Sequence, residues 1–118
     1  MSWIDSPQFN VLQRFLDVNA ERQTLVSTNL ANVDTPGYRT RDLDFRGELQ
    51  RAMSGEDSEL TSAFVVPVRG LIARPDGNNV SVDRESMLLA EVQLQYKAAT
   101  SILRAQFAEL RTAIREGQ

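Results

Sequence analysis

Acidic side chains beside two expected turns are the strongest candidates for catalytic or metal-binding residues in this sequence. Asp42 and Asp44 are separated by one residue, and Asp34 precedes Asp42 by a short segment. A carboxylate pair can supply a general acid and a general base when a pocket raises one pKa and leaves the other low. The sequence predicts no domain that would form such a pocket, and Asp beside a turn is typical of a solvated cap. We therefore expect no catalytic residue and no enzymatic activity.

The composition also argues against metal and cofactor sites. The segment 76–79, Asp-Gly-Asn-Asn, offers hard oxygen ligands, but it lacks the twelve-residue pattern of a calcium-binding loop. The chain has no Cys and no His, so it can form neither a disulfide nor a thiolate site, and it lacks the commonest zinc ligand and general base. We expect no metal, no cofactor-binding residue and no cofactor.

Length and charge place the chain in a broad class. A chain of 118 residues is long enough for one domain with a modest core. Its formal net charge of −3 gives no basic patch for nucleic acid. We also expect no small-molecule substrate. No apolar run approaches the roughly 20 residues of a membrane span, and the N-terminus lacks the basic and apolar regions of a secretory signal. By sequence alone, such a chain would be taken as cytosolic.

A long helix is predicted over 7–32. Ser6 is a preferred N-cap, and Pro7 suits the first helical position. Apolar residues then recur with the alternating steps of three and four that are typical of a heptad seam, interrupted by Asn19 and Gln23. Polar residues at such positions fix register and partner choice. The apolar seam residues are Leu12, Leu16, Val26 and Leu30.

A second helix is predicted from about Asp83, a good N-cap, towards the C-terminus. No Gly or Pro occurs between Arg84 and Glu116, so this helix could reach a length on the order of 50 Å. That length and the width of the apolar face exceed what one partner helix can cover. Its seam residues are Leu89, Val92, Tyr96, Ala99, Leu103, Phe107, Leu110 and Ile114.

The segment between the helices is predicted to be irregular. The alternation over 42–45 favours a brief strand, and Phe45 to Met53 favours a short helix. The acidic, small residues over 54–59 are typical of a mobile loop. Together with the long helices, these features predict a mainly α fold with a small irregular middle containing short strands.

Two further features are expected in the second half of the middle segment. The residues 64–68 are β-prone, but Pro67 restricts them to an edge or extended segment. The segment 76–79 predicts a turn, and Val80 and Val82 predict a short strand after it.

The segment Thr35-Pro36-Gly37-Tyr38 predicts a tight turn directly after the first helix. Pro36 fixes its own φ near −65° and disfavours helical geometry at Thr35, so the helix must end before it. Gly37 accepts the positive φ that the third position of a type II turn requires. This pattern alone indicates only that a helix is followed by a turn.

Longer strings around this turn resemble a known family. Ala31-Asn32-x-x-Thr35-Pro36-Gly37-Tyr38-Arg39 resembles the N-terminal signature of the flagellar rod, hook and hook-associated axial proteins. The residues 42–45, the block 76–85 and the string Gln95-Tyr96-Lys97-Ala98-Ala99 are similar to the proximal member of the flagellar basal-body rod protein family. By this resemblance, the residues of an assembly motif are Asn29, Asn32, Thr35, Pro36, Gly37 and Tyr38.

The resemblance implies an architecture and a function. The terminal helices, 1–33 and 83–118, would pair as an antiparallel coiled-coil hairpin and form an inner rod domain, and 34–82 would make outer contacts. The protein would be a structural subunit of the proximal rod, crossing the periplasm and transmitting torque. Its partners would be copies of itself, other rod proteins, the rod-to-MS-ring junction protein and the flagellar export apparatus, which would export it without a cleaved signal peptide.

Two alternatives remain open on the sequence. The helix seams are compatible with an intramolecular hairpin core, and a cytosolic helical adaptor or export chaperone would share the composition and the long helices. Charges near the turn could form ion pairs either on the subunit surface or between subunits. These charges are Arg39, Arg41 and Arg46 with Asp34, Asp42, Asp44 and Glu48.

Overall fold

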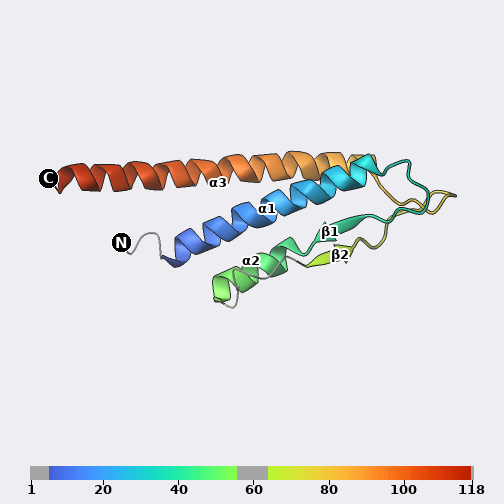
Figure 1. The fold of residues 1–118 in the computed structure, drawn as a ribbon, viewed down its shortest axis with the longest axis horizontal. Helices are drawn as coiled ribbons and strands as arrows, with labels where there is room; N and C mark the ends of the chain where they lie inside the picture. Colours follow the sequence, from blue (N-terminus) through green and yellow to red (C-terminus); the bar gives the residue numbers. More distant parts are fainter. Residues whose placement is uncertain (1–5, 56–63, 118) are drawn as a thin grey trace.

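Two long antiparallel helices form the body of the molecule (Figure 1). The structure is a computed structural model, and it describes residues 6–55 and 64–117. Helix α1 spans Pro7–Ala31 and helix α3 spans Val82–Glu116, with a small middle segment between them that contains one short helix and two short strands. The predicted fold, mainly α with long terminal helices and a small irregular middle, is confirmed.

Local sequence sets the ends of both long helices. The Oγ atom of Ser6 accepts a hydrogen bond from the N–H of Phe9 at 3.2 Å, so Ser6 caps α1 as predicted. The N-cap of α3 is Ser81, whose Oγ atom accepts from the N–H of Arg84 at 3.2 Å. The prediction of Asp83 as N-cap was wrong by two residues; Asp83 lies in the first turn, where its charge still favours the helix dipole.

The strand predicted at Val80 and Val82 is absent from the described part of the chain. Val80 is buried, with 4% of its surface exposed, in a segment without regular structure. Val82 is the first residue of α3. The cap at Ser81 starts the helix where a strand would have to continue, which explains the error.

The middle segment folds back along α1. Strand β1, Arg41–Leu43, pairs antiparallel with strand β2, Val65–Pro67, so that Leu43 lies opposite Val65. Helix α2, Phe45–Ser54, is capped by Asp44 and ends at Gly55. The predicted short strand, short helix and extended segment are therefore confirmed with small shifts of their ends. Most of the loop predicted over 54–59 lies outside the described residues.

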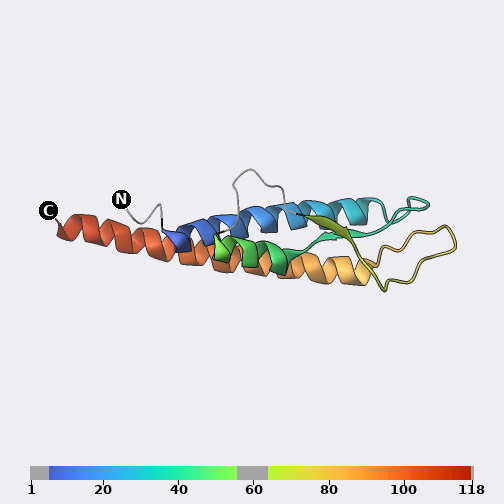
Figure 2. The same cartoon turned by 90° about the horizontal axis from the view of Figure 1, so that it is seen from below.

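The two views of the ribbon place these elements in space. Helix α1 lies between α3 and the layer formed by α2 and the strands (Figure 1). Seen from below, the strands and α2 run along the helix pair, and the irregular loops gather at the end where α1 stops and α3 begins (Figure 2). We call this end of the molecule the junction.

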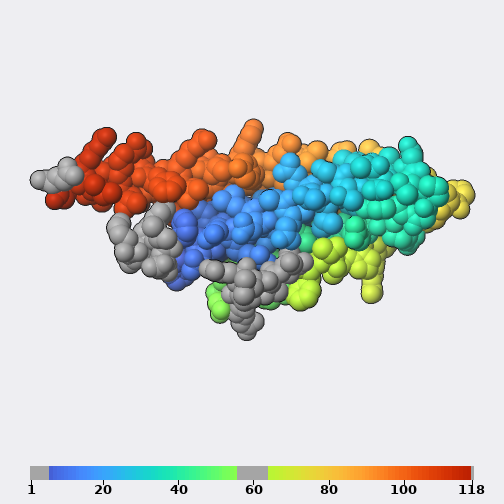
Figure 3. All heavy atoms as spheres, in the orientation of Figure 1, coloured from blue at the N-terminus to red at the C-terminus, as the bar shows by residue number. Residues whose placement is uncertain are grey.

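The molecule is elongated. Its extents are 68 × 26 × 18 Å and its radius of gyration is 18.2 Å, against about 13.5 Å for a compact domain of this length. The C-terminal part of α3 extends beyond the start of α1 (Figure 1), at the red end of the space-filling view (Figure 3). Among the described residues of α3, no side chain after Ala99 is buried. The buried core therefore lies towards the junction, and about half of α3 has no full partner.

Candidate assembly site

Asn29 is the centre of the junction. Only 1% of its surface is exposed. Its Nδ2 atom donates to the carbonyl oxygen of Arg41 at 2.8 Å and to a carboxylate oxygen of Glu85. Its Oδ1 atom accepts from the hydroxyl of Tyr38 at 2.8 Å and from the N–H of Arg41 at 3.3 Å. One amide thus joins α1, the turn, β1 and α3, with both donors and both acceptor positions in use.

Asn78 ties the second loop to the end of α1. Its Nδ2 atom donates to the carbonyl oxygens of Asn32 and Thr35, each at 2.9 Å. Its Oδ1 atom accepts from the N–H of Val80 at 2.9 Å. Asn78 is fully buried, and its amide satisfies backbone groups at the end of α1, in the turn and in its own loop.

The predicted turn is present. Gly37 has a φ of +76°, and the N–H of Tyr38 donates to the carbonyl oxygen of Thr35 at 3.2 Å, as a type II turn requires. The N–H of Gly37 also donates to the carbonyl oxygen of Asp76 at 2.8 Å. A Cβ atom on Gly77 would lie 3.5 Å from the Cα atom of Gly37. The two loops therefore touch backbone to backbone, at an ordinary van der Waals distance.

Asp42 is held by arginines from both long helices. Arg22 of α1 donates to its two carboxylate oxygens through Nε and a terminal nitrogen, each at 3.1 Å, and Arg84 of α3 donates at 2.8 Å. Burial alone would raise the pKa of Asp42. The hydrogen bonds from Arg22, the Leu43 N–H and Arg84 outweigh it, so the pKa is lowered. The carboxylate stays charged and links α1, β1 and α3.

Glu85 is in the opposite electrostatic position. It is completely buried at the start of α3 and accepts hydrogen bonds from Asn29 and Arg84. Burial is the largest influence and raises its pKa, and the nearby charge of Asp42 adds to the rise. The hydrogen bond from Asn29 and the charges of Arg84 and Arg22 lower the pKa, but they do not outweigh the rise. The charged form of Glu85 is therefore penalised in the folded chain.

Like Asp42, Glu48 is a charged carboxylate that links several elements, in this case α2 and its neighbours. Its carboxylate accepts from Arg14 of α1 at 2.9 Å, from Arg51 of α2, and from the N–H of Phe64 at 2.9 Å. Burial would raise its pKa, but the bonds from Phe64, Arg14 and Arg51 outweigh burial and lower it. A single carboxylate thus joins α1, α2 and the start of the β2 segment.

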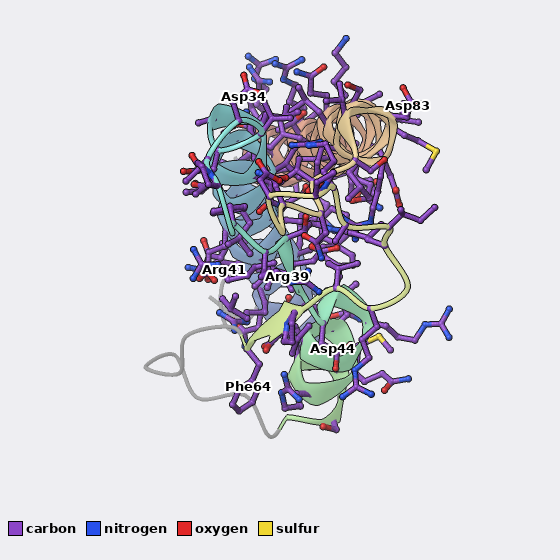
Figure 4. All side chains as sticks on the ribbon, turned by 90° about the vertical axis from the view of Figure 1, so that its right-hand side faces the viewer. Asp34, Arg39, Arg41, Asp44, Phe64 and Asp83 are labelled. Atoms are coloured by element: carbon purple, nitrogen blue, oxygen red, sulfur yellow. The ribbon has the colours of Figure 1, made fainter. Side chains whose placement is uncertain are left out.

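The arginines expected to form ion pairs around the turn do not form them, and other arginines pair with the carboxylates instead. In the parts of the chain that the structure describes, Arg39, Arg41 and Arg46 form no ion pair; the arginines that do pair stand on the three helices. Figure 4 shows Asp34 at the end of α1 and Asp44 beside α2, on opposite sides of the molecule. The carboxylates therefore do not form one cluster, because the fold separates residues that are close in sequence.

The predicted seam of α1 faces inward in part. Val26 is buried, and Leu12, Leu16 and Leu30 are half-buried. Asn19 is buried with 1% exposed, whereas Gln23 is exposed. Neither polar atom of the Asn19 amide has a hydrogen-bond partner among the described residues. Of the two polar interruptions, only Asn19 lies within the helix interface.

The predicted stripe of α3 divides between two faces. Val92 and Ala99 are buried, and the structure leaves Tyr96, Phe107 and Ile114 about half exposed, at 54%, 49% and 54%. The remaining seam residues, Leu89, Leu103 and Leu110, are half-buried. One apolar face of α3 thus packs on α1, and a second face is open on the subunit.

An apolar groove lies between α3 and the two other helices. It has a volume of about 540 Å³ and runs between the start of α1, the end of α2 and the middle of α3. Val11 and Phe15 line it from α1, Met53 from α2, and Ala98 and Ile102 from α3.

Within the residues described, no group of His, Cys, Asp and Glu could hold a metal ion, and no helix has the length and hydropathy to span a membrane.

Comparison with known proteins decides the family. The chain is 34% identical to the flagellar basal body rod protein FlgB of Yersinia ruckeri and equally to that of Escherichia coli K12, over 89% of this chain and 91% of each relative. It is 32% identical to FlgB of Borrelia hermsii, over 90% of this chain and 94% of that protein. The chain belongs to the FlgB family of flagellar basal body rod proteins. No protein-family model matches it.

Four residues of the expected assembly motif form hydrogen bonds within this FlgB-family subunit. Asn29, Asn32, Thr35 and Tyr38 all bond inside the junction, although the sequence indicated only a motif for assembly. The sequence pattern did not predict the buried Glu85 or the two arginines that meet at Asp42. A Glu in the first turn of a helix is usually solvated, and nothing in the local sequence signals that this one is covered.

Proposed function

We propose that this chain is a subunit of the proximal flagellar rod that joins its neighbours through the open faces of its terminal helices. Membership of the FlgB family makes it a structural component of the flagellar basal-body rod and not an enzyme. The observation that supports the helix contacts is the second apolar face of α3, where Tyr96, Phe107 and Ile114 are about half exposed. Exposed apolar surface of this kind marks a protein–protein contact.

In this proposal the two ends of the subunit have different tasks. The junction closes the fold and sets the angle at which α1 meets α3. The open half of α3 and the start of α1 pack against copies of the chain and other rod proteins, in an inner rod domain of residues 1–33 and 83–118. Residues 34–82 make outer contacts, and the motif turn presents Pro36 and Gly37, both exposed, to neighbouring subunits.

The finer surroundings follow from the same proposal. The assembled rod would stand in the periplasm, transmit torque and contact the rod-to-MS-ring junction protein. The subunit would reach it through the flagellar export apparatus without a cleaved signal peptide. These partners need surfaces that are open on the free subunit, which the C-terminal part of α3 provides.

A pair of charge insertions tests the helix contacts. Ile114→Asp places a carboxylate in the open apolar face, and Thr112→Asp places the same charge on the opposite, polar side of the same turn. We expect tagged Ile114→Asp protein to be made but absent from sedimented hook-basal bodies and the cells to be non-motile, because a buried unpaired charge is strongly unfavourable. Thr112→Asp should behave like the unaltered chain.

Two results would contradict the proposal. Normal recovery of Ile114→Asp in basal bodies would show that this face is not an interface. Failure of the unaltered tagged chain to sediment with basal bodies, with all of it in the soluble fraction, would favour a cytosolic adaptor instead.

A further inference from the structure

The loop between β2 and α3 carries an apolar side chain that is almost fully exposed. Ile72 has 92% of its surface exposed, the highest value among the large apolar residues that the structure describes. The loop is anchored on both sides of it: the N–H of Val68 donates to the backbone just before β1 at 3.1 Å, and the N–H of Arg74 donates to the carbonyl oxygen of Asn78 at 2.8 Å. We call residues 70–73 the knob. A side chain presented on an anchored loop loses little conformational freedom on binding, so the knob suits insertion into a partner.

The groove between the three helices is incomplete in a complementary way. Met53 and Ile102 line it but remain 67% and 52% exposed. Gln95 and Gln106 also line it, and the Oε1 atom of each is buried without a hydrogen-bond partner among the described residues. The Nε2 atom of Gln95 donates to Glu91 at 3.3 Å, so the Oε1 atom is the end left for a partner. The groove therefore suits an occupant with an apolar body and N–H donors.

The knob supplies both properties. Its apolar side chains are those of Leu71 and Ile72, and the groove volume of about 540 Å³ leaves room for the two together. Among the described residues, the N–H groups of the knob have no hydrogen-bond partner. They are therefore available to acceptors on another molecule.

Charges beside the two surfaces are also complementary. Arg69 directly precedes the knob, and Glu109 lies one turn of α3 beyond Gln106, which lines the groove. Both are exposed, and neither has an ion-pair partner within the described part of the chain. Opposite charges next to a contact favour one orientation of the partners.

The fold keeps the knob and the groove of one subunit apart. The loop lies at the junction, whereas α1, whose first turns line the groove, begins towards the opposite end of the molecule (Figure 2). Each copy thus presents one knob and one groove on different surfaces. A contact between two different surfaces is heterologous, and it continues into an open chain of copies unless the rotation between them closes a ring.

We propose that the knob of one copy inserts into the groove of a second copy, with Ile72 against Met53 and Ile102 and with knob N–H groups donating to Gln95 and Gln106. This assigns a partner to the groove, in addition to the contacts of the open helix faces. The place of this contact in the assembled rod rests on the proposed function. The contact between copies does not, so the two can fail separately.

Disulfide trapping on the purified full chain tests the contact, because the chain has no Cys of its own. Protein with Ile72→Cys is mixed with protein carrying Ala98→Cys, in the groove, and the mixture is oxidised with diamide. A disulfide requires Cα atoms within about 7 Å, so only a knob seated in a groove should give a dimer on a non-reducing gel. The matched control is Ala90→Cys, at an exposed alanine of α3 outside the groove. We expect several-fold more dimer with Ala98→Cys than with Ala90→Cys, and little from Ile72→Cys alone.

A chain that carries both Ile72→Cys and Ala98→Cys distinguishes an open series of copies from a closed pair. We expect a ladder of crosslinked oligomers, because each copy then has a reactive knob and a reactive groove. Equal dimer yields with Ala98→Cys and Ala90→Cys would overturn the proposal. So would the highest yield from Ile72→Cys alone, which would show a symmetric contact between two loops. These yields come from purified protein, so they test the contact whatever the fractionation of basal bodies shows.

Discussion

The two halves of α3 differ in what surrounds them. At the junction, the first turns of α3 are held by buried polar groups, with Glu85 bonded to Asn29 and Arg84 bonded to Asp42. After Ala99, apolar side chains such as Phe107 and Ile114 remain about half exposed. Directional bonds specify one geometry, whereas an open apolar face accepts a partner. This contrast supports the proposal that the junction sets the shape of the subunit and that the C-terminal half of α3 serves assembly.

The largest expected effect is at the centre of the junction. Asn29→Leu keeps the side-chain shape but leaves Glu85, the Arg41 backbone and the Tyr38 hydroxyl without their shared partner. Buried polar groups without a hydrogen-bond partner are destabilising, and we expect a loss of about 3 kcal/mol in the free energy of unfolding. Urea unfolding followed by circular dichroism measures it. The control Gln23→Leu, at an exposed amide of the same helix, should change stability by about 0.5 kcal/mol or less.

The contrast between the buried and the exposed amide would fail if the two variants had the same free energy of unfolding. Equal stability of Asn29→Leu and Gln23→Leu would mean that the polar network contributes nothing and that apolar packing alone holds the junction.

The next effect separates two glycines with the same backbone conformation. Gly37 and Gly55 have φ values of +76° and +77°, so valine at either is strained by about 1–3 kcal/mol. Gly37 lies in the turn that bonds to the loop before α3, whereas Gly55 caps the short α2. We expect Gly37→Val to lower the midpoint of global unfolding more than Gly55→Val, and asparagine at position 37 to be milder than valine. A larger loss of stability from Gly55→Val than from Gly37→Val would show that the turn does not stabilise the junction.

The third effect has the opposite sign. Asn19 is as buried as Asn29, but its amide is unpaired among the described residues. Asn19→Leu replaces an unsatisfied polar group by an apolar one of similar shape, and we expect the free subunit to become more stable by about 1 kcal/mol. Thermal unfolding of the two leucine variants in parallel checks this contrast. Destabilisation by Asn19→Leu would show that the amide has a partner in solution.

The smallest effect is a dependence on pH. The folded chain raises the pKa of Glu85, so the folded state binds a proton before the unfolded state does as the pH falls. Relative to Glu85→Gln, the unaltered chain should gain stability as the pH falls towards about 4.3, the ordinary value for Glu. Asp42, whose pKa is lowered, contributes a slope of the opposite sign, and that slope lies below this range. A stability difference that does not change with pH would mean that Glu85 keeps an ordinary pKa.

Sequence reasoning captured what local chemistry determines. Ser6 and Pro7 start a helix, Pro36 stops it, and Gly37 adopts a positive φ, each for reasons confined to a few residues. The seam residues were found by periodicity, but not which of them one partner covers, because that depends on the angle between the helices. The role of the candidate assembly residues remains a proposal, since the hydrogen bonds that the structure shows for them lie within the subunit.

The junction network could not be predicted in the same way. Arg22 and Arg84 are 62 positions apart in sequence and meet only because α1 and α3 pack on either side of Asp42. Local charge patterns favoured Arg39, Arg41 and Arg46 instead. Long-range pairs of this kind follow from the fold and leave no local signal.

We propose that α3 is packed within the subunit at its N-terminal end and binds neighbouring subunits at its C-terminal end. Amide hydrogen exchange on the dilute, monomeric subunit tests it most directly. The account predicts strong protection from Leu88 to Ala99 and little protection from Ala108 to Glu116, since helical stability comes mainly from packing an apolar face. Protection that stays uniform along the whole of α3 in the monomer would contradict it.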